Sequence, residues 1–386
     1  MLFNCINSVA MSKKQYLAER KRIAAGTLLK ADLSQDDTLN RTFNFVSANL
    51  LNFLPGIPAD THEALFSQML MHQQLSMLDY HHPDALNQVR TEGAYEDAIA
   101  LLKNRPAIIC TFHMGSNRVL NHMLAAAGIP FTVVAANHIA RGEGEAFSQM
   151  YAREYNRQQP FTVIEAQQPN AGLQMLRELK KGRSLLIYID GNTGSGDDTI
   201  HNENRTRIDF LNGHIYARSG VAYLSHLANV PVIPVVSYRT SLNCIRLRIE
   251  QAIYPDTTVS RKQYAATATQ QIYNAFAPLL QQYPEQWECW MYLHKMVDCK
   301  AFTGADAVQQ DTHPATGAFH LNKSRYGVFN IGNEWYLFHK QSYTSYPVNR
   351  DIYQLLFKSF SNAVQREEIS SQVFEQLYAH KVFIQA

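Results

Sequence analysis

The chain has 386 residues, of which 46% are hydrophobic and 18% are charged, so it can bury a sizeable core and is not a disordered chain. Its formal net charge is only +2, from 35 basic and 33 acidic side chains. This balance argues against broad nucleic-acid binding, which needs a clustered basic surface.

The cysteines and the hydropathy pattern predict the cellular compartment of the protein. The five cysteines are widely spread and form no CxxC pair, which indicates neither a disulfide framework nor a zinc site and favours a reducing compartment. The segment Met1–Ala10 lacks the basic and apolar regions of a signal peptide, and no run approaches the roughly 18 apolar residues of a spanning helix. We therefore expect a cytoplasmic protein, with a peripheral contact to the inner membrane left open.

Hydrophobic periodicity divides the first three quarters of the chain. Residues 12–104 carry apolar positions at helical spacing and predict a helical region. After it, short apolar runs alternate with amphipathic helices, which is typical of a largely parallel sheet. The predicted strands are Ala107–Phe112, Phe131–Ala135, Phe161–Glu165, Ser184–Asp190, Val232–Tyr238 and Ile245–Glu250, and the predicted helices are Ala171–Lys181, Val221–Asn229 and 262–283. The fold class is therefore α/β, with a central mixed, largely parallel sheet flanked by helices.

The last part of the chain has a different character. Two short aromatic strands, Gly327–Phe329 and Glu334–His339, precede two short helices, Asp351–Phe360 and Ser370–Ala379, and predict a small α+β module. The predicted domains are an N-terminal helical region (1–86), an α/β core (87–302), a polar linker (303–317) and a C-terminal module (318–386).

The sharpest local feature is a histidine that directly follows a predicted strand. The run Ala107–Phe112 leads into His113, and Ser116 is placed to cap a helix that Gly128 ends. Ligands of open α/β sheets bind beyond the carboxyl ends of the strands. A neutral imidazole there can act as a general base, and backbone N–H groups at the helix start can stabilise an oxyanion. The spacing alone fits an ordinary loop histidine equally well.

A second polar side chain ends another predicted strand. Asp190 closes the run Ser184–Asp190 and is followed by the glycine-rich loop Gly191–Gly196. If the two strands are parallel, His113 and Asp190 lie at the same edge of the sheet. No Gly-Lys-Ser/Thr follows the loop, so we interpret it as a connection and not as a phosphate loop. The histidine spacings indicate no metal site, and we expect no cofactor.

The third feature is a pair of glycines before a predicted helix. Gly213 and Gly220 bracket the approach into Val221–Asn229, with Arg218 and Ser219 at the helix start. On their own, these residues fit a turn with a capping serine and a solvated arginine.

Taken in order, these segments resemble the lysophospholipid acyltransferase superfamily, in its branch of lipid A lauroyl and myristoyl transferases. The resemblance runs from about Asn87 to Lys295, over half the chain. The segments that carry it are His113, Arg153 or Arg157, Asp190, Phe210–Gly213 with Gly220, Val230–Pro234 and Pro284–Trp290. It implies an acyltransferase that uses an acyl carrier protein or coenzyme A thioester, with His113 as general base.

The resemblance also suggests roles for the remaining candidates. Asn117 and Asp190 are the residues expected to position the imidazole. The expected substrate-binding residues are Arg118, Arg157, Gly213, Arg218, Ser219 and Gly220.

The chain departs from the family pattern at two points. The family places an acidic residue five positions after the histidine (the HX4D motif), whereas this chain has Arg118 there. A guanidinium cannot accept the ring N–H and disfavours the imidazolium, so Asn117 or Asp190 has to accept that hydrogen. The N-terminal membrane helix typical of the lipid A enzymes is also absent from the sequence. Both departures point toward a soluble acceptor.

Residues 318–386 resemble a winged-helix peptide-binding module, the recognition element of ribosomal-peptide pathways. Such modules bind a leader peptide as an added strand at a sheet edge. The alternative is a winged-helix domain that packs on the core or makes a dimer.

We expect acyl transfer to a hydroxyl or amine of a small molecule, lipid or peptide, in lipid or natural-product biosynthesis, without nucleic acid. Two alternatives remain: hydrolysis of the same thioester, and a non-catalytic acyl- or peptide-binding protein that lost the acidic partner of the histidine. Product analysis separates the first from acyl transfer, and donor binding without turnover would favour the second.

Overall fold

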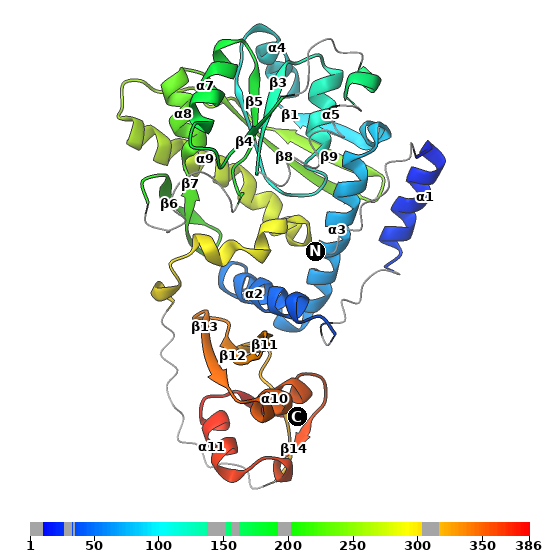
Figure 1. Ribbon diagram of the computed structural model, residues 1–386, viewed down its shortest axis with the longest axis vertical. Helices are drawn as coiled ribbons and strands as arrows, with labels where there is room; N and C mark the ends of the chain where they lie inside the picture. The colour runs from blue at the N-terminus through cyan, green and yellow to red at the C-terminus, as the bar shows by residue number, and fades with distance from the viewer. Residues whose placement is uncertain are drawn as a thin grey trace. The chain divides into compact units, whose positions relative to one another are not determined.

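The computed structural model describes residues 11–26, 33, 35–136, 148, 151–155, 162–191, 202–302 and 316–386 (Figure 1). They form two compact units. The first unit comprises Met1–Leu29, Ser67–Phe210 and His214–Cys289, and the second comprises Lys30–Phe66, Leu211–Gly213 and Trp290–Ala386. Most of the predicted linker, 303–315, lies outside the described residues. The four-domain division remains a prediction.

A seven-stranded sheet forms the centre of the first unit, in the order β1-β9-β8-β2-β5-β3-β4. The strands from β8 to β4 are parallel, β9 is antiparallel to β8, and β1 is parallel to β9. The strand bounds are β1 Val89–Gly93, β2 Ile108–Thr111, β3 Phe131–Ala135, β4 Thr162–Glu165, β5 Ser184–Tyr188, β8 Val232–Ser241 and β9 Cys244–Ile249. The predicted fold class, a mixed and largely parallel sheet flanked by helices, is confirmed.

Three strands of the first unit correct the sequence prediction. β1 lies inside the region predicted to be helical, and the short two-stranded sheet of β6 (Arg205–Phe210) and β7 (Gly213–Arg218) was not predicted. The residues of β1 are all at least partly exposed, because β1 is an edge strand that pairs only with β9. A strand with no buried face lacks the apolar pattern by which strands are found in a sequence.

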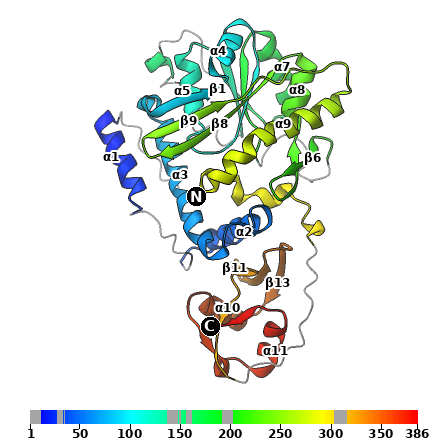
Figure 2. The same ribbon diagram turned by 180° about the vertical axis from the view of Figure 1, so that it is seen from behind.

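Helices cover both faces of the sheet. Figures 1 and 2 show α7, α8 and α9 on one side of it and α5 on the other. The helices of this unit are α1 Lys13–Ala24, α3 His62–Tyr80 (from Ser67 onward), α4 Tyr95–Asn104, α5 Val119–Ala126, α7 Ala171–Lys180, α8 Gly220–Ala228 and α9 Arg261–Gln282. Among the described residues, no helix is both long and apolar enough to span a membrane.

The ends of α5 show one prediction that holds and one that is wrong. Gly128 follows the helix with a φ of +75°, as a terminating glycine does. Ser116 does not cap it. The helix begins at Val119 without a side-chain cap, and the Ser116 hydroxyl instead donates to the carboxylate of Asp79 on α3. A capping hydroxyl has to accept from an N–H of the helix start, and the Ser116 oxygen here accepts from the buried guanidinium of Arg239 instead.

The second unit joins α2 (Asp37–Phe53) to the C-terminal module. Its two three-stranded antiparallel sheets have the orders β14-β10-β15 and β11-β12-β13. The amides of Asn40 and Asn44 on α2 both donate to Val328 O, at 2.9 and 3.1 Å. A Cβ at Gly327 would lie 1.6 Å from Asn44 Oδ1, so only glycine allows this approach.

The elements of the C-terminal module agree with the predicted α+β character. The bounds are β10 Ala318–Leu321, β11 Tyr326–Ile331, β12 Glu334–His339, β13 Thr344–Val348, α10 Arg350–Ser361, β14 Val364–Gln365, α11 Ser371–Ala379 and β15 Phe383–Gln385. The sequence predicted both helices and two of these strands. The resemblance of residues 318–386 to a peptide-binding module stays a prediction.

Candidate active site

The structure brings His113 and Asp190 into direct contact. β2 and β5 are parallel neighbours, with Thr111 opposite Tyr188, so His113 and Asp190 each lie two residues beyond the end of their strand. His113 Nδ1 lies 2.7 Å from Asp190 Oδ1, and the backbone N–H of His113 donates to Oδ2 at 2.8 Å. The shared sheet edge that the sequence predicts is therefore real.

The contact with Asp190 defines the protonation of the imidazole. A carboxylate only accepts, so Nδ1 carries the hydrogen and Nε2 keeps its lone pair in the neutral ring. Burial lowers the pKa of His113, but the Asp190 carboxylate outweighs burial and raises the pKa above its ordinary value. The His113 side chain is 22% exposed and that of Asp190 is fully buried. Nε2 is thus the basic atom of a partly accessible imidazole.

Asp190 has a third donor that the sequence analysis did not assign. The indole Nε1–H of Trp287 donates to Asp190 Oδ2 at 2.7 Å. Burial raises the pKa of Asp190, but the hydrogen bonds and charge of His113 and the indole of Trp287 lower it by more. The net pKa is below the ordinary value, so the carboxyl stays ionised. The only sequence signal for this role was the place of Trp287 in the segment Pro284–Trp290 that resembles the family.

That segment also pairs with the backbone of the histidine loop. Glu288 N donates to His113 O at 2.9 Å, and Gly115 N donates to Gln286 O at 3.0 Å. Residues 113–115 and 286–288 therefore run side by side. The two segments, far apart in sequence, hold the imidazole and the indole on the same carboxylate.

Aromatic rings pack around Trp287. Phe210 and Phe276 lie 5.7 and 5.4 Å from its ring, and Phe112 stacks on Phe276 at 3.9 Å. All four rings are fully buried. Phe210 belongs to the segment that the sequence analysis linked to substrate binding through its glycines, and here its ring supports the indole that contacts Asp190.

The turn after His113 requires glycine. Gly115 has a φ of +56°, in the left-handed region. A Cβ there would lie 2.8 Å from Tyr238 Cα and 2.9 Å from Ser237 O. Both are backbone atoms that cannot move aside cheaply, so the loop can lie against β8 only with glycine at this position.

Asn117 and Arg118 follow in the same loop without contacting the ring nitrogens of His113. Asn117 is buried, and its Oδ1 has no hydrogen-bond partner among the described residues. The guanidinium of Arg118 contacts Met77 Sδ and lies 5.5 Å from the ring centre of Tyr80, both on α3. Asp190 and not Asn117 accepts the ring hydrogen. Arg118 lowers the pKa of His113, but less than Asp190 raises it.

The next candidates lie where β7 meets α8. Arg218 ends β7, and Gly220 is the first residue of α8. Ser219 precedes the helix without capping it, and its hydroxyl donates to Asn204 O at 3.1 Å. The predicted cap is wrong, and the substrate-binding roles of Arg218, Ser219 and Gly220 stay predictions.

The remaining candidates have diverse surroundings. Gly213 falls in the second unit, where a Cβ would lie 3.1 Å from the Phe53 ring. Arg153 is exposed and pairs with the adjacent Glu154 at 2.7 Å. Arg157 lies outside the described residues.

One group of side chains in the described part has the composition of a metal site. The possible ligand atoms of His113, Asp190 and Cys289 all lie within 4.8 Å of one another. His113 Nδ1 is already hydrogen bonded to Asp190, and Cys289 Sγ donates to Asp190 O at 3.3 Å. Burial and the nearby Asp190 raise the pKa of the Cys289 thiol well above its ordinary value, so it keeps its proton. These side chains fit a hydrogen-bond network better than a metal site.

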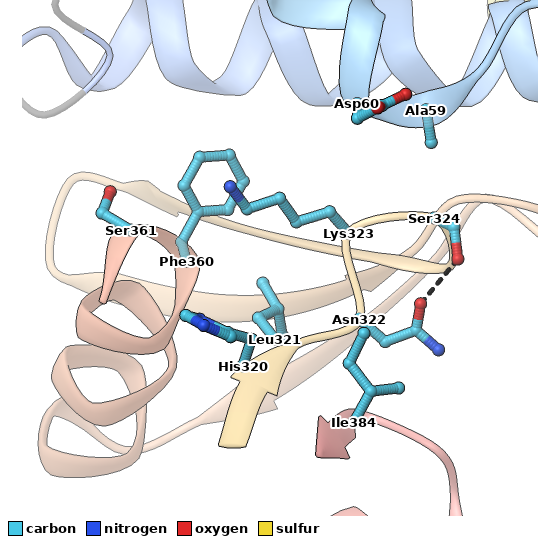
Figure 3. A pocket seen from close by; sticks show the side chains of 10 residues that line it. All are labelled: Ala59, Asp60, His320, Leu321, Asn322, Lys323, Ser324, Phe360, Ser361 and Ile384. Carbon is cyan, nitrogen blue, oxygen red and sulfur yellow. Dashed lines mark hydrogen bonds between the residues drawn. The ribbon is translucent and has the colours of Figure 1, made fainter. Parts of the chain in front are cut away.

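A hollow lies in the second unit (Figure 3). Lys323 Nζ lies over the ring of Phe360, 4.1 Å from its centre. The lining residues are Ala59, Asp60, His320, Leu321, Asn322, Lys323, Ser324, Phe360, Ser361 and Ile384. Neither member of the His113–Asp190 pair is among them.

The fold and the first unit's site together define a class: an α/β protein with a histidine–aspartate pair at the carboxyl edge of a parallel sheet. A family model described as bacterial lipid A biosynthesis acyltransferase matches residues 43–296, which is more than half of the chain. The chain therefore belongs to this family, and its membership implies acyltransferase activity with an acyl donor and a lipid acceptor. No curated protein matches the chain.

Proposed function

We propose that the protein moves a fatty-acyl group from an acyl carrier protein or coenzyme A thioester to a hydroxyl or amine, with His113 as general base. The observation that carries this proposal is the 2.7 Å hydrogen bond from His113 Nδ1 to the fully buried carboxylate of Asp190. It leaves Nε2 as the proton acceptor on the more exposed member of the pair.

The proposed reaction uses Nε2 for both proton transfers. The oxygen or nitrogen of the acceptor attacks the thioester carbonyl carbon, and Nε2 takes the proton that the acceptor loses. The tetrahedral intermediate then expels the thiolate, the C–S bond breaks, and the imidazolium returns the proton to sulfur. Asp190 stays ionised and stabilises the imidazolium between the two transfers.

The missing acid after His113 was the main argument for a non-catalytic protein. Asp190 supplies the acceptor that Arg118 cannot, from just beyond the neighbouring strand β5 instead of from just before helix α5. Three donors hold that carboxylate, two of them from His113 and one from Trp287. This support for the imidazole favours an active enzyme over a binding protein.

The candidate acceptors are hydroxyls and amines. Family membership favours a lipid hydroxyl. Residues 318–386 lie beyond the matched segment, and their resemblance to a peptide-binding module leads us to include peptide hydroxyls and amines among the acceptors to test. Donors and acceptors are therefore tested as panels.

The test measures thiol release from acyl-coenzyme A and acyl carrier protein donors, with mass spectrometry of the products. We expect thiol release by the wild type that falls by roughly 10³-fold or more in His113→Ala. His214→Ala is the matched control, because His214 Nδ1 also lies 2.7 Å from a carboxylate, that of Asp209, on the surface.

Release that depends on a hydroxyl or amine acceptor would support acyl transfer, and release of free fatty acid with every acceptor would indicate a thioesterase instead. Equal rates for wild type and His113→Ala would contradict the proposed role of His113. Saturable donor binding without release would favour a binding protein.

A further inference from the structure

A buried ionic cluster lies in the first unit beside the loop that carries His113. Its centre is Asp79 on α3, which accepts hydrogen bonds from Tyr16, Arg20, Ser116 and Arg239. Tyr16 OH lies 2.6 Å from Asp79 Oδ1, and Arg20 Nη1 donates to Tyr16 OH at 2.9 Å. All five side chains are buried, with at most 3% exposure of any residue.

The cluster contacts the histidine loop directly. Ser116 lies three residues after His113, and its hydroxyl contacts both Asp79 and Arg239. Arg239 N donates to Gln286 Oε1 at 2.7 Å, and Gln286 Nε2 donates to Arg239 O at 2.8 Å. Because Gln286 O also accepts from the N–H of residue 115, the loop is held through Ser116 on one side and Gln286 on the other.

The charges of this cluster depend on one another. Two guanidinium groups share one carboxylate, and a buried charge without a partner is strongly unfavourable. Burial raises the pKa of Asp79, but the charges of Arg239 and Arg20 lower it by more. The net pKa is below the ordinary value, so the carboxylate stays ionised. Loss of either guanidinium would therefore shift the remaining partners, including Ser116.

Two of the five members come from α1, which precedes the segment matched by the family model. The buried residues of α1 are Tyr16, Arg20 and Ile23, so two of the three belong to the ionic cluster, while Tyr16 and Ile23 also pack in the hydrophobic core of the first unit. Arg20 Nη2 also donates to Leu242 O at the turn between β8 and β9. The geometry points to α1 as a positioning element of the active site, with Tyr16 and Arg20 acting through Asp79 and Ser116 on the loop that carries His113.

This inference rests on the proposed function, and its test compares Arg20→Met with Arg22→Met in the full chain. Arg22 is on the same helix but is exposed and pairs with Glu19, so its replacement is the matched control. We expect kcat for thiol release to fall about tenfold in Arg20→Met, with KM for the donor within about twofold, and no change in Arg22→Met. Arg20→Lys, which restores the charge, should recover part of kcat.

Hydrogen exchange of residues 113–118 gives a second readout that does not need activity. Their amides should exchange faster in Arg20→Met than in Arg22→Met. If Arg20→Met does not fold, Tyr16→Phe carries the same test, with an expected loss in kcat of roughly threefold.

Wild-type kcat and exchange in folded Arg20→Met, even with a lower melting temperature, would reduce α1 to a stabilising helix and overturn the inference. A wild type that releases no thiol would contradict the proposed function alone. Faster exchange of 113–118 in Arg20→Met would still support the positioning role.

Discussion

Among its described residues, the first unit holds two histidine–aspartate pairs with the same short Nδ1–Oδ1 distance and different surroundings. His113–Asp190 and His214–Asp209 both have an Nδ1–Oδ1 distance of 2.7 Å. The side chains of the first pair are 22% and 0% exposed, and those of the second are 50% and 80% exposed. The distance between the two groups therefore does not distinguish a candidate catalytic pair from a surface contact.

The difference lies in what surrounds each carboxylate. Among the described residues, the carboxylate of Asp209 is bonded only by His214, whereas that of Asp190 also accepts from Trp287 and from the N–H of His113. In water an exposed pair is screened and contributes about 0–1 kcal/mol. A buried carboxylate with three donors keeps one orientation and one charge, and this is what a general base needs from its partner.

Replacing each aspartate by asparagine should separate the two pairs most strongly. In Asp190→Asn the amide no longer holds the Nδ1–H tautomer, so we expect kcat/KM to fall roughly 10³-fold. Asp209→Asn should stay within about twofold. Thiol-release kinetics with a saturating acceptor measure both, and a similar loss in the two variants would remove the distinction.

The loop that carries His113 also depends on the close approach of Gly115 to the backbone of β8. Gly115→Ala would place a Cβ 2.8 Å from Tyr238 Cα in addition to the strained φ of +56°. Gly26 has a φ of +66° and open space around it, so Gly26→Ala isolates the strain. We expect losses in the free energy of unfolding of about 2–4 kcal/mol for Gly115→Ala and about 1 kcal/mol for Gly26→Ala. Urea titrations that gave equal losses would contradict the predicted clash.

Removing the third donor of Asp190 should weaken the buried pair without abolishing it. Trp287→Phe keeps an aromatic ring against Phe210 and Phe276 but leaves Asp190 Oδ2 without the indole N–H. We expect about a tenfold lower kcat and a loss in stability of about 1–3 kcal/mol. Trp335→Phe, in the second unit, is the control. A wild-type kcat in Trp287→Phe would show that two donors suffice for Asp190.

The pH dependence of activity should report the pKa of His113. Its folded pKa lies above the ordinary value of about 6.5 because Asp190 outweighs burial, and the base form is needed for catalysis. We therefore expect kcat/KM to rise with pH and to reach half its maximum above about pH 6.5. His214→Ala should leave this profile unchanged, and a midpoint at or below about 6.5 would contradict the raised pKa.

The contribution of His113 to stability should change with pH in the opposite sense to its contribution to activity. The raised pKa of His113 contributes stability that is complete below about pH 6.5 and is lost as the pH rises through the folded value. The lowered pKa of Asp190 contributes stability that is complete above about pH 3.9 and is lost as the pH falls through the folded value. Unfolding of wild type and His113→Ala at about pH 5.5 and 8.5 should show the larger difference at the lower pH.

Local sequence patterns determined the main strands, several helix ends and the place of the two candidate catalytic residues. The buried runs before His113 and Asp190 form β2 and β5 because apolar side chains on both faces suit only an interior strand. Gly128 and Gly182 follow helices with positive φ, which L side chains avoid. These features depend on a few neighbouring residues, so the sequence alone predicts them.

The tertiary structure alone decided which groups meet. It pairs the exposed residues of β1 with β9, turns the Ser116 hydroxyl from the predicted cap to Asp79, and brings the indole of Trp287 to Asp190. It also leaves Asn117 without the predicted contact to the imidazole. Each of these outcomes depends on the burial and hydrogen-bonding needs of a partner far away in the chain. No local pattern of apolar and polar residues carries that information.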